Sequence, residues 1–153
     1  SLNSMTIKSI SGVLEQNIEC CTTSSKIWNF YYGITGIEKA TRKQNGMQNL
    51  TIDYTTDTNG RILSAAYSET GGFNGELFYT FDSFGNTVAL TNTQGNVIVG
   101  YLYDLNNGAI KSEYNPQGID NPYKVGGKEG SLAFSVDSST NVILYPIGND
   151  YII

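Results

Sequence analysis

The sequence predicts an all-β protein in which successive antiparallel β-hairpins form a curved sheet. The first observation is composition: the 153 residues contain 17 Gly and 11 Tyr, with many Thr, Asn and Ser and little Ala or Glu. Tyr, Thr, Val and Ile favour pleated strands, while Gly and Asn favour the turns between them. The second observation is an alternation of short β-like runs with turn residues, without a convincing apolar stripe at helical spacing.

The first third of the chain contains unevenly spaced strand candidates. They are expected at residues 6–10, 12–18, 27–32 and 50–54. Residues 37–42 come nearest to a helical pattern but are too few to support a helix. Because no proline-rich or serine-rich linker divides the chain, we interpret residues 1–153 as a single domain, with 131–153 as an extra terminal hairpin.

The turn chemistry becomes regular from Asp57 onward. Four turns each precede a short apolar run, and their central residues are Asn59-Gly60, Gly85-Asn86, Gly95-Asn96 and Asn107-Gly108. Glycine and asparagine supply the positive φ angle that primed hairpin turns need. The sequence therefore predicts a series of tight hairpins with primed turns.

Charge and composition exclude several function classes. The net charge is −5, with nine Lys and Arg spread along the chain, which argues against a nucleic-acid surface. The absence of histidine removes the commonest general base and the commonest zinc ligand. No apolar run is long enough for membrane insertion as a helix. We expect no metal and no cofactor.

The two cysteines and the first residues carry little functional information. Cys20 and Cys21 are adjacent, and neighbouring Cα atoms lie about 3.8 Å apart, below the usual disulfide span. Their role stays open. Residues 1–5 lack the basic end and the apolar core of a signal peptide, and we interpret them as a cloning scar or a cut in a longer chain.

A spaced pattern of aromatic residues, aspartate and glycine recurs along the chain. The two closest units are Tyr79-x-Phe81-Asp82-x-x-Gly85-Asn86 and Tyr101-x-Tyr103-Asp104-x-x-x-Gly108, and Tyr54-x-x-Asp57-x-x-Gly60-Arg61 is a looser copy. The pattern resembles the YD repeat of Rhs-type proteins, which include bacterial polymorphic toxins, wall-associated proteins, insecticidal Tc toxin subunits and animal teneurins.

The order of the units adds to this resemblance. An aromatic run, Phe30-Tyr31-Tyr32-Gly33, precedes the repeats, Gly95-Asn96 lies between the two closest units, and Asn121-Pro122-Tyr123 follows them. The same order is found in the Rhs-associated core of the family, and the resemblance covers roughly residues 28–130.

The motif also has a physical interpretation. Two aromatic residues at positions i and i+2 of a strand point to the same face of the sheet. Stacked units would place such rings beside one another on neighbouring strands, and each pair would stabilise the sheet by about 0.2–1 kcal/mol. We expect the aspartate to accept hydrogen bonds from backbone N–H groups of the turn, and the glycine to turn the chain.

The resemblance implies a function as well as a fold. The family's sheet spirals into a hollow shell around cargo, so this chain would be one scaffold segment of a large secreted or cell-surface bacterial protein, without an active site. Its partners would be other repeat segments of the same parent chain, an encapsulated toxin domain, or a second copy paired through open sheet edges.

The chain departs from the family after Glu129. The family usually continues with a tail that ends near Asp-Pro-x-Gly, and in toxin members an aspartate-dependent self-cleavage site lies there. No Asp-Pro occurs in this sequence, so self-cleavage is not assigned.

Two alternatives to the scaffold stay open. Trp28, Tyr31 and Tyr32, with Tyr123, are candidates for an exposed platform that binds a glycan or a protein partner, as in an adhesin module. A glycosidase would need two carboxylates facing one cleft, and the chain has several, although Asp57, Asp82 and Asp104 directly precede turns.

Overall fold

The computed structural model describes residues 4–9, 16–21, 26–130, 132–135, 141–147 and 150–152. Ten strands form one antiparallel sheet in which each strand pairs with the one before it in the sequence. The strands are β1 (Ser4–Ser9), β2 (Gln16–Cys21), β3 (Lys26–Gly33), β4 (Gly36–Gln44), β5 (Met47–Thr56), β6 (Ile62–Glu69), β7 (Asn74–Phe81), β8 (Thr87–Thr91), β9 (Val97–Tyr103) and β10 (Ile110–Tyr114). The predicted all-β fold of successive antiparallel hairpins is confirmed.

Most predicted strand positions are close to the observed ones. Of the second predicted strand, 12–18, residues 12–15 lie outside the described residues, and 16–18 belong to β2, which continues through both cysteines. Residues 37–42, the nearest approach to a helical pattern, lie in β4. In the region of the predicted terminal hairpin, β11 (Leu132–Ser135), β12 (Asn141–Ile147) and β13 (Asp150–Ile152) form a three-stranded antiparallel sheet. Glycine residues flank the single 3₁₀ turn of the described chain, η1 (Gly127–Glu129).

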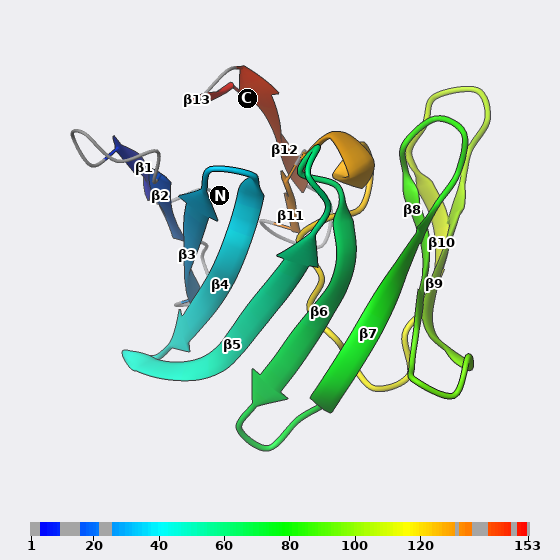
Figure 1. Cartoon of the computed structure of the whole chain (residues 1–153), viewed down its shortest axis with the longest axis horizontal. Helices are drawn as coiled ribbons and strands as arrows, with labels where there is room; N and C mark the ends of the chain where they lie inside the picture. The colour runs from blue at the N-terminus through cyan, green and yellow to red at the C-terminus, as the bar shows by residue number, and fades with distance from the viewer. Residues whose placement is uncertain are drawn as a thin grey trace.

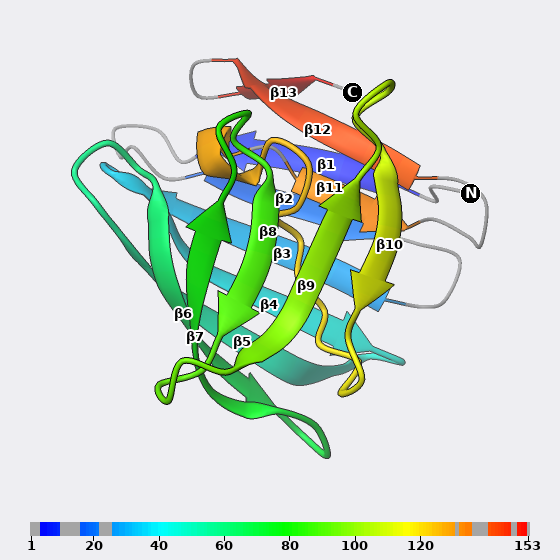
Figure 2. The same ribbon diagram turned by 90° about the vertical axis from the view of Figure 1, so that its right-hand side faces the viewer.

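The sheet curls strongly, so that β3–β5 and β8–β10 lie on opposite sides of the molecule (Figure 2). After β10 the chain turns back and crosses the hollow of the sheet, and we call residues 115–126 the return segment (Figure 1). The inner face of the sheet is the one that this segment covers. Alternation of side chains along each strand places one set of residues on this face, as period-2 geometry requires.

The core lies between the inner face and the return segment. Side chains with no exposed surface come from most of the described strands, namely Phe30, Ala40, Ile52, Ala65, Leu77, Leu90 and Val99. The return segment adds Ile119 and Tyr123, which are 3% and 1% exposed. The curved sheet thus buries its apolar face against the return segment of its own chain.

Three of the hairpin turns share one geometry. In each, the backbone N–H of the turn glycine donates a hydrogen bond to the carbonyl oxygen of the residue three positions before it. The three bonds are Gly60 N to Asp57 O, Gly85 N to Asp82 O and Gly95 N to Asn92 O. The glycines have φ angles of 84°, 86° and 82°, while the preceding residues keep negative φ. This is a type I turn followed by a left-handed glycine.

The prediction of primed turns was therefore wrong at Asn59-Gly60, Gly85-Asn86 and Gly95-Asn96, and it was also wrong at Asn107-Gly108. A primed turn of type I′ needs positive φ at two successive residues, and only the glycine of each turn has it. Asn45-Gly46, between β4 and β5, has φ angles of 53° and 80° and does fit type I′.

Candidate functional site

The aromatic residues of the repeats lie on the inner face. Tyr79 and Phe81 of β7 stack with ring centroids 5.9 Å apart, and Tyr101 and Tyr103 of β9 lie 6.4 Å apart. The expected ring stacking across neighbouring strands is not formed by these units, because β8 lies between them. Leu90 of β8 is opposite Tyr79 on one side and Val99 on the other. Aromatic strands thus alternate with a short aliphatic strand.

Asn121 of the return segment connects the hydroxyl groups of two repeats. Its Oδ1 accepts a hydrogen bond from the Tyr79 hydroxyl at 2.6 Å, and its Nδ2 donates to the Tyr101 hydroxyl at 3.3 Å and to the Tyr123 carbonyl at 2.8 Å. Oδ1 also accepts from the Tyr123 backbone N–H at 3.1 Å. The amide is 1% exposed. One buried side chain therefore joins β7, β9 and the return segment.

Tyr123 extends this contact to the first half of the sheet. Its ring packs edge-on against Tyr54 of β5, with centroids 5.4 Å apart, and its hydroxyl lies 3.1 Å from that of Tyr32 of β3. Pro122 between the two anchors is also buried. The Asn-Pro-Tyr triplet therefore fills the hollow of the sheet as a plug.

An ion cluster holds Asp120, the residue directly before this plug. Arg42 of β4 is 4% exposed and donates to Asp120 Oδ2 at 2.9 Å and to Glu69 Oε2 at 2.6 Å. Its guanidinium lies 5.9 Å from the centre of the Trp28 ring. Charge-assisted hydrogen bonds to both carboxylates compensate the burial of the arginine. The Asp120 carbonyl also accepts a hydrogen bond from the Tyr67 hydroxyl at 3.0 Å.

Burial changes the acid–base behaviour of the inner-face tyrosines. Removal from water raises the pKa of Tyr54 and Tyr67 well above the ordinary value of 10, and nearby Tyr79 adds to this effect. Burial likewise raises the pKa of Tyr79, Tyr101 and Tyr103. These phenols stay protonated at neutral pH, and they are not candidate general bases.

The aspartates of the repeats cap the turns. Asp57 Oδ1 accepts from the backbone N–H groups of Asn59 and Arg61, at 2.9 and 3.0 Å. Asp82 Oδ1 accepts from those of Phe84 and Asn86, both at 2.9 Å. In the longer turn before β10, Asp104 Oδ1 accepts from Asn106 N at 2.8 Å, and Gly108 there has a φ of 72°. A turn cap accounts for each of these carboxylates.

The turn between β7 and β8 also clamps the end of the return segment. Asn86 Oδ1 accepts from Gly126 N at 2.9 Å, Thr87 N donates to the Lys124 carbonyl, and Lys128 N donates to the Gly85 carbonyl. An added Cβ on Gly127 would lie 2.7 Å from Thr87 Oγ1, so the close approach needs glycine. In the turn of the looser repeat, Arg61 follows the glycine instead, and its Nε lies 3.4 Å from Asp57 Oδ2.

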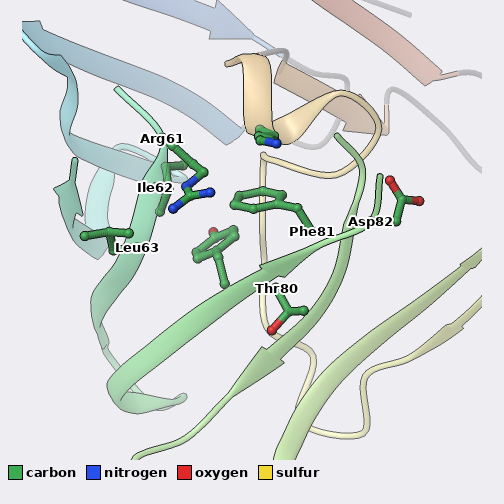
Figure 3. Close-up of a pocket in the computed structure, with 8 residues that line it drawn as sticks. Arg61, Ile62, Leu63, Thr80, Phe81 and Asp82 are labelled. Carbon is green, nitrogen blue, oxygen red and sulfur yellow. The ribbon is translucent and has the colours of Figure 1, made fainter. Parts of the chain in front are cut away.

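A small cavity lies where β6 and β7 separate. Their pairing ends at Ser64 and Phe78, so Ile62 and Leu63 have no partner on β7. The cavity has a volume of about 290 Å³ and is lined by Arg61, Ile62, Leu63, Tyr79, Thr80, Phe81, Asp82 and Lys128. Arg61, directly before β6, and Phe81, the last residue of β7, project toward this opening (Figure 3). Residues of two repeats thus meet here.

The four aromatic residues proposed as a platform do not share one exposed surface, and Tyr123 is buried in the plug. Trp28 is 3% exposed and stacks on Phe30, with centroids 5.6 Å apart. Tyr32 contacts the plug through its hydroxyl. Tyr31 is 39% exposed and lies on the opposite, outer face. Successive side chains of β3 point to opposite faces of the sheet, so Tyr31 is separated from Trp28 and Tyr32.

Several residues of the site did not stand out in the sequence. Asn92 caps its turn like the aspartates, by accepting from Gln94 N and Asn96 N, and its spacing of three residues before Gly95 was the available signal. Arg42, Glu69, Tyr67 and Asp120 are brought together only by the curvature of the sheet. No spacing in the sequence could have indicated their contact.

Within the described ranges, no group of three or more Cys, Asp or Glu side chains is arranged to hold a metal ion. Over the same part of the chain, no helix is long and apolar enough to span a membrane.

The fold and the plugged inner face define a hairpin-repeat β-sheet protein whose motif side chains are structural. Over 106 residues, or 69% of this chain, the sequence is 24% identical to the tRNA3(Ser)-specific nuclease WapA of Bacillus spizizenii. The chain spans about 4% of the length of that protein. No family model matches the sequence. The similarity is distant and partial, and it agrees with the resemblance of the motifs to wall-associated repeat proteins.

Proposed function

We propose that this chain is a non-catalytic scaffold segment of a large secreted or cell-surface repeat protein of the Rhs type, which encloses or displays a toxin or other cargo. The observation that carries the proposal is the commitment of the motif side chains to the fold. The hydroxyls of Tyr79 and Tyr101 bind Asn121, and the carboxylates of Asp57 and Asp82 cap turns.

The open edge of the sheet supports a place within a larger wall. β10 pairs with β9 on one side, and all five of its residues are exposed. An unpaired strand edge is a template for further strands. We propose that a flanking repeat of the parent chain adds to this edge, and that a second copy does so when the segment is isolated.

The cell-surface location rests on the comparison. The resemblance to WapA covers a small fraction of that protein, so it supports a common scaffold region rather than a common activity. The nuclease function in its name is not carried over to this chain. The scaffold role makes this division physically reasonable, since a repeat sheet can support different cargo domains.

Cryo-electron microscopy of the purified parent protein would test the proposal. We expect strands to continue along β10, with Tyr79 and Tyr101 turned to the interior of a closed wall. A parent protein in which β10 faces solvent and the segment stands alone as a separate domain would contradict the scaffold role.

A functional assay provides a second test. Asp82→Asn keeps an oxygen that can accept the turn hydrogen bonds, so we expect folding and any activity of the parent protein to persist. A folded Asp82→Asn parent protein without activity would show that this carboxylate has a chemical role. Asp57→Asn serves as the matched control in an equivalent turn.

A further inference from the structure

A polar groove lies on the outer face of β3, β4 and β5. It has a volume of about 490 Å³ and is lined by Tyr31, Tyr32, Glu38, Lys39, Thr41, Gln48 and Asp53. The register places Tyr31 directly opposite Lys39, and Lys39 directly opposite Asp53. Three neighbouring strands therefore present an aromatic ring, an ammonium group and a carboxylate in one row.

The charged groups of this groove are not used by the fold. Glu38, Lys39 and Asp53 are exposed, and within the described residues none of their side-chain polar atoms makes a hydrogen bond or ion pair. Tyr31 is 39% exposed. The inner face differs in this respect, because its tyrosine, asparagine and arginine groups are bound to one another. The groove thus has both donors and acceptors available to a ligand.

The chemistry of the lining favours one class of ligand. Two carboxylates and one ammonium group oppose the binding of phosphate or another anion. The polar lining does not suit an apolar ligand, in contrast to the apolar groove between Phe84 and Leu105 at the tips of the β7–β8 and β9–β10 hairpins. A sugar presents hydroxyl groups along its edges and C–H groups on its faces. Carboxylate, amide and ammonium groups can bind the hydroxyls, while an aromatic ring packs on the C–H face.

We propose that this groove binds a short neutral saccharide, with Tyr31 stacked on a sugar ring and Asp53 and Glu38 accepting hydrogen bonds from its hydroxyls. Both carboxyl groups are exposed, so their oxygens are accessible to the hydroxyl groups of a sugar. This site is independent of the scaffold role: binding could be lost while the sheet assembles normally, or the reverse.

Chemical-shift titration of the ¹⁵N-labelled full chain would test the site. The probes are glucose, galactose, N-acetylglucosamine and the disaccharides of each. We expect saturable shifts at the amides of residues 31, 39 and 53 with at least one probe. Tryptophan fluorescence is not a suitable readout, because Trp28 is buried on the inner face. The absence of saturation below roughly 10 mM for every probe, about 2.7 kcal/mol of binding, would overturn the proposal.

Matched variants localise the effect. Tyr31→Ala is expected to weaken binding about tenfold, whereas Tyr31→Phe keeps the ring and should stay within about threefold of the native affinity. Tyr114→Ala removes another exposed tyrosine, on β10 and outside the groove, and should leave affinity unchanged. Equal loss with Tyr31→Ala and Tyr114→Ala, or no loss with Tyr31→Ala, would contradict the proposed site.

Discussion

Asn121 is the residue on which the inner face depends most directly. Its amide group bonds to Tyr79, Tyr101 and the backbone of Tyr123 in a site without solvent. A buried hydroxyl that loses its hydrogen-bond partner retains its full desolvation penalty. Single residues of this kind specify how the return segment sits on the sheet.

Asn121→Ala should therefore lower the free energy of unfolding by about 2–4 kcal/mol, because two buried tyrosine hydroxyls and a backbone N–H lose their partner. Urea unfolding followed by circular dichroism measures the change. Asn96→Ala, at an exposed turn position, is the matched control and should change stability by less than about 0.5 kcal/mol. Similar values for both variants would mean that the hydrogen bonds of Asn121 contribute little.

The buried tyrosines predict a specific response to alkaline pH. Burial raises the pKa of Tyr54, Tyr67 and Tyr79 in the folded protein above the value of about 10 that the unfolded chain has. The folded state then holds more protons than the unfolded state above this pH. Stability should be unaffected by these groups below about pH 10 and should fall as the pH rises beyond it.

Phenolate absorbance and circular dichroism, followed together, measure this response. We expect the absorbance of the buried tyrosines to rise in the same transition that removes the β-sheet signal. Complete phenolate formation while the sheet signal is intact would contradict the buried hydrogen-bonded arrangement.

At the scale of the elements, the hairpin turns do more than reverse the chain. The turn between β5 and β6 packs against the one between β3 and β4, and an added Cβ on Gly60 would lie 2.8 Å from the Thr35 carbonyl oxygen. Gly95 has almost the same φ, 82° against 84°, but an added Cβ there would meet no atom within 4 Å. Equivalent turns thus differ only in their surroundings.

This pair allows the backbone strain and the turn–turn contact to be separated. Gly95→Ala should cost about 1–2 kcal/mol, the strain of a left-handed alanine. Gly60→Ala should cost about 1–3 kcal/mol more, because the Thr35 backbone must move. Chemical denaturation of both variants gives the difference. Equal losses would indicate that the two turns do not press on each other.

The ion cluster around Arg42 acts at the same scale, since it ties β4 and β6 to the return segment. Arg42→Met leaves Glu69 without its cation and leaves Asp120 with the longer, 3.8 Å ion pair to Lys26. It should loosen residues 119–123, with a loss of about 2–3 kcal/mol, allowing for the partial exposure of both carboxylates. Amide hydrogen exchange of the return segment measures this opening directly. Lys43→Met, at the next, exposed position, is the control, and equal exchange in both variants would contradict the role of Arg42.

At the scale of the whole molecule, a single curved sheet forms a core because it closes on its own chain. A sheet with one apolar face normally needs a second layer. Here β3–β5 and β8–β10 curl around the return segment, and Ile119 and Tyr123 fill the space between them (Figure 2). This arrangement leaves the outer face of the sheet and the edge of β10 available for contacts with other chains or ligands.

The open edge gives a prediction about association. The unpaired edge of β10 can pair with a strand of another chain. We therefore expect the native chain to self-associate with rising concentration, as measured by sedimentation. Ser112→Pro removes a backbone N–H in the middle of β10 and should reduce association. A native chain that stays monomeric at all concentrations would contradict association through this edge.

The sequence by itself determined the positions of most turns, the approximate positions of several strands, and the fact that the paired aromatic residues of each motif share one face of the sheet. These features are local: strand alternation follows a period of two, and an aspartate or asparagine three residues before a glycine can cap the turn from within it. Asn92 shows that the same rule extends to a turn without aspartate. The turn type itself was predicted wrongly, because glycine and asparagine suit both a primed turn and a type I turn followed by a left-handed glycine.

Only the tertiary structure decided what the aromatic residues contact. The curvature of ten strands and the path of residues 115–126 bring Asn121 to Tyr79 and Tyr101, and Asp120 to Arg42, which is 78 residues away in the chain. The same curvature buries Trp28 and leaves Tyr31 in a groove with Lys39 and Asp53. Such contacts depend on the summed twist of many strands, which no local pattern of residues encodes.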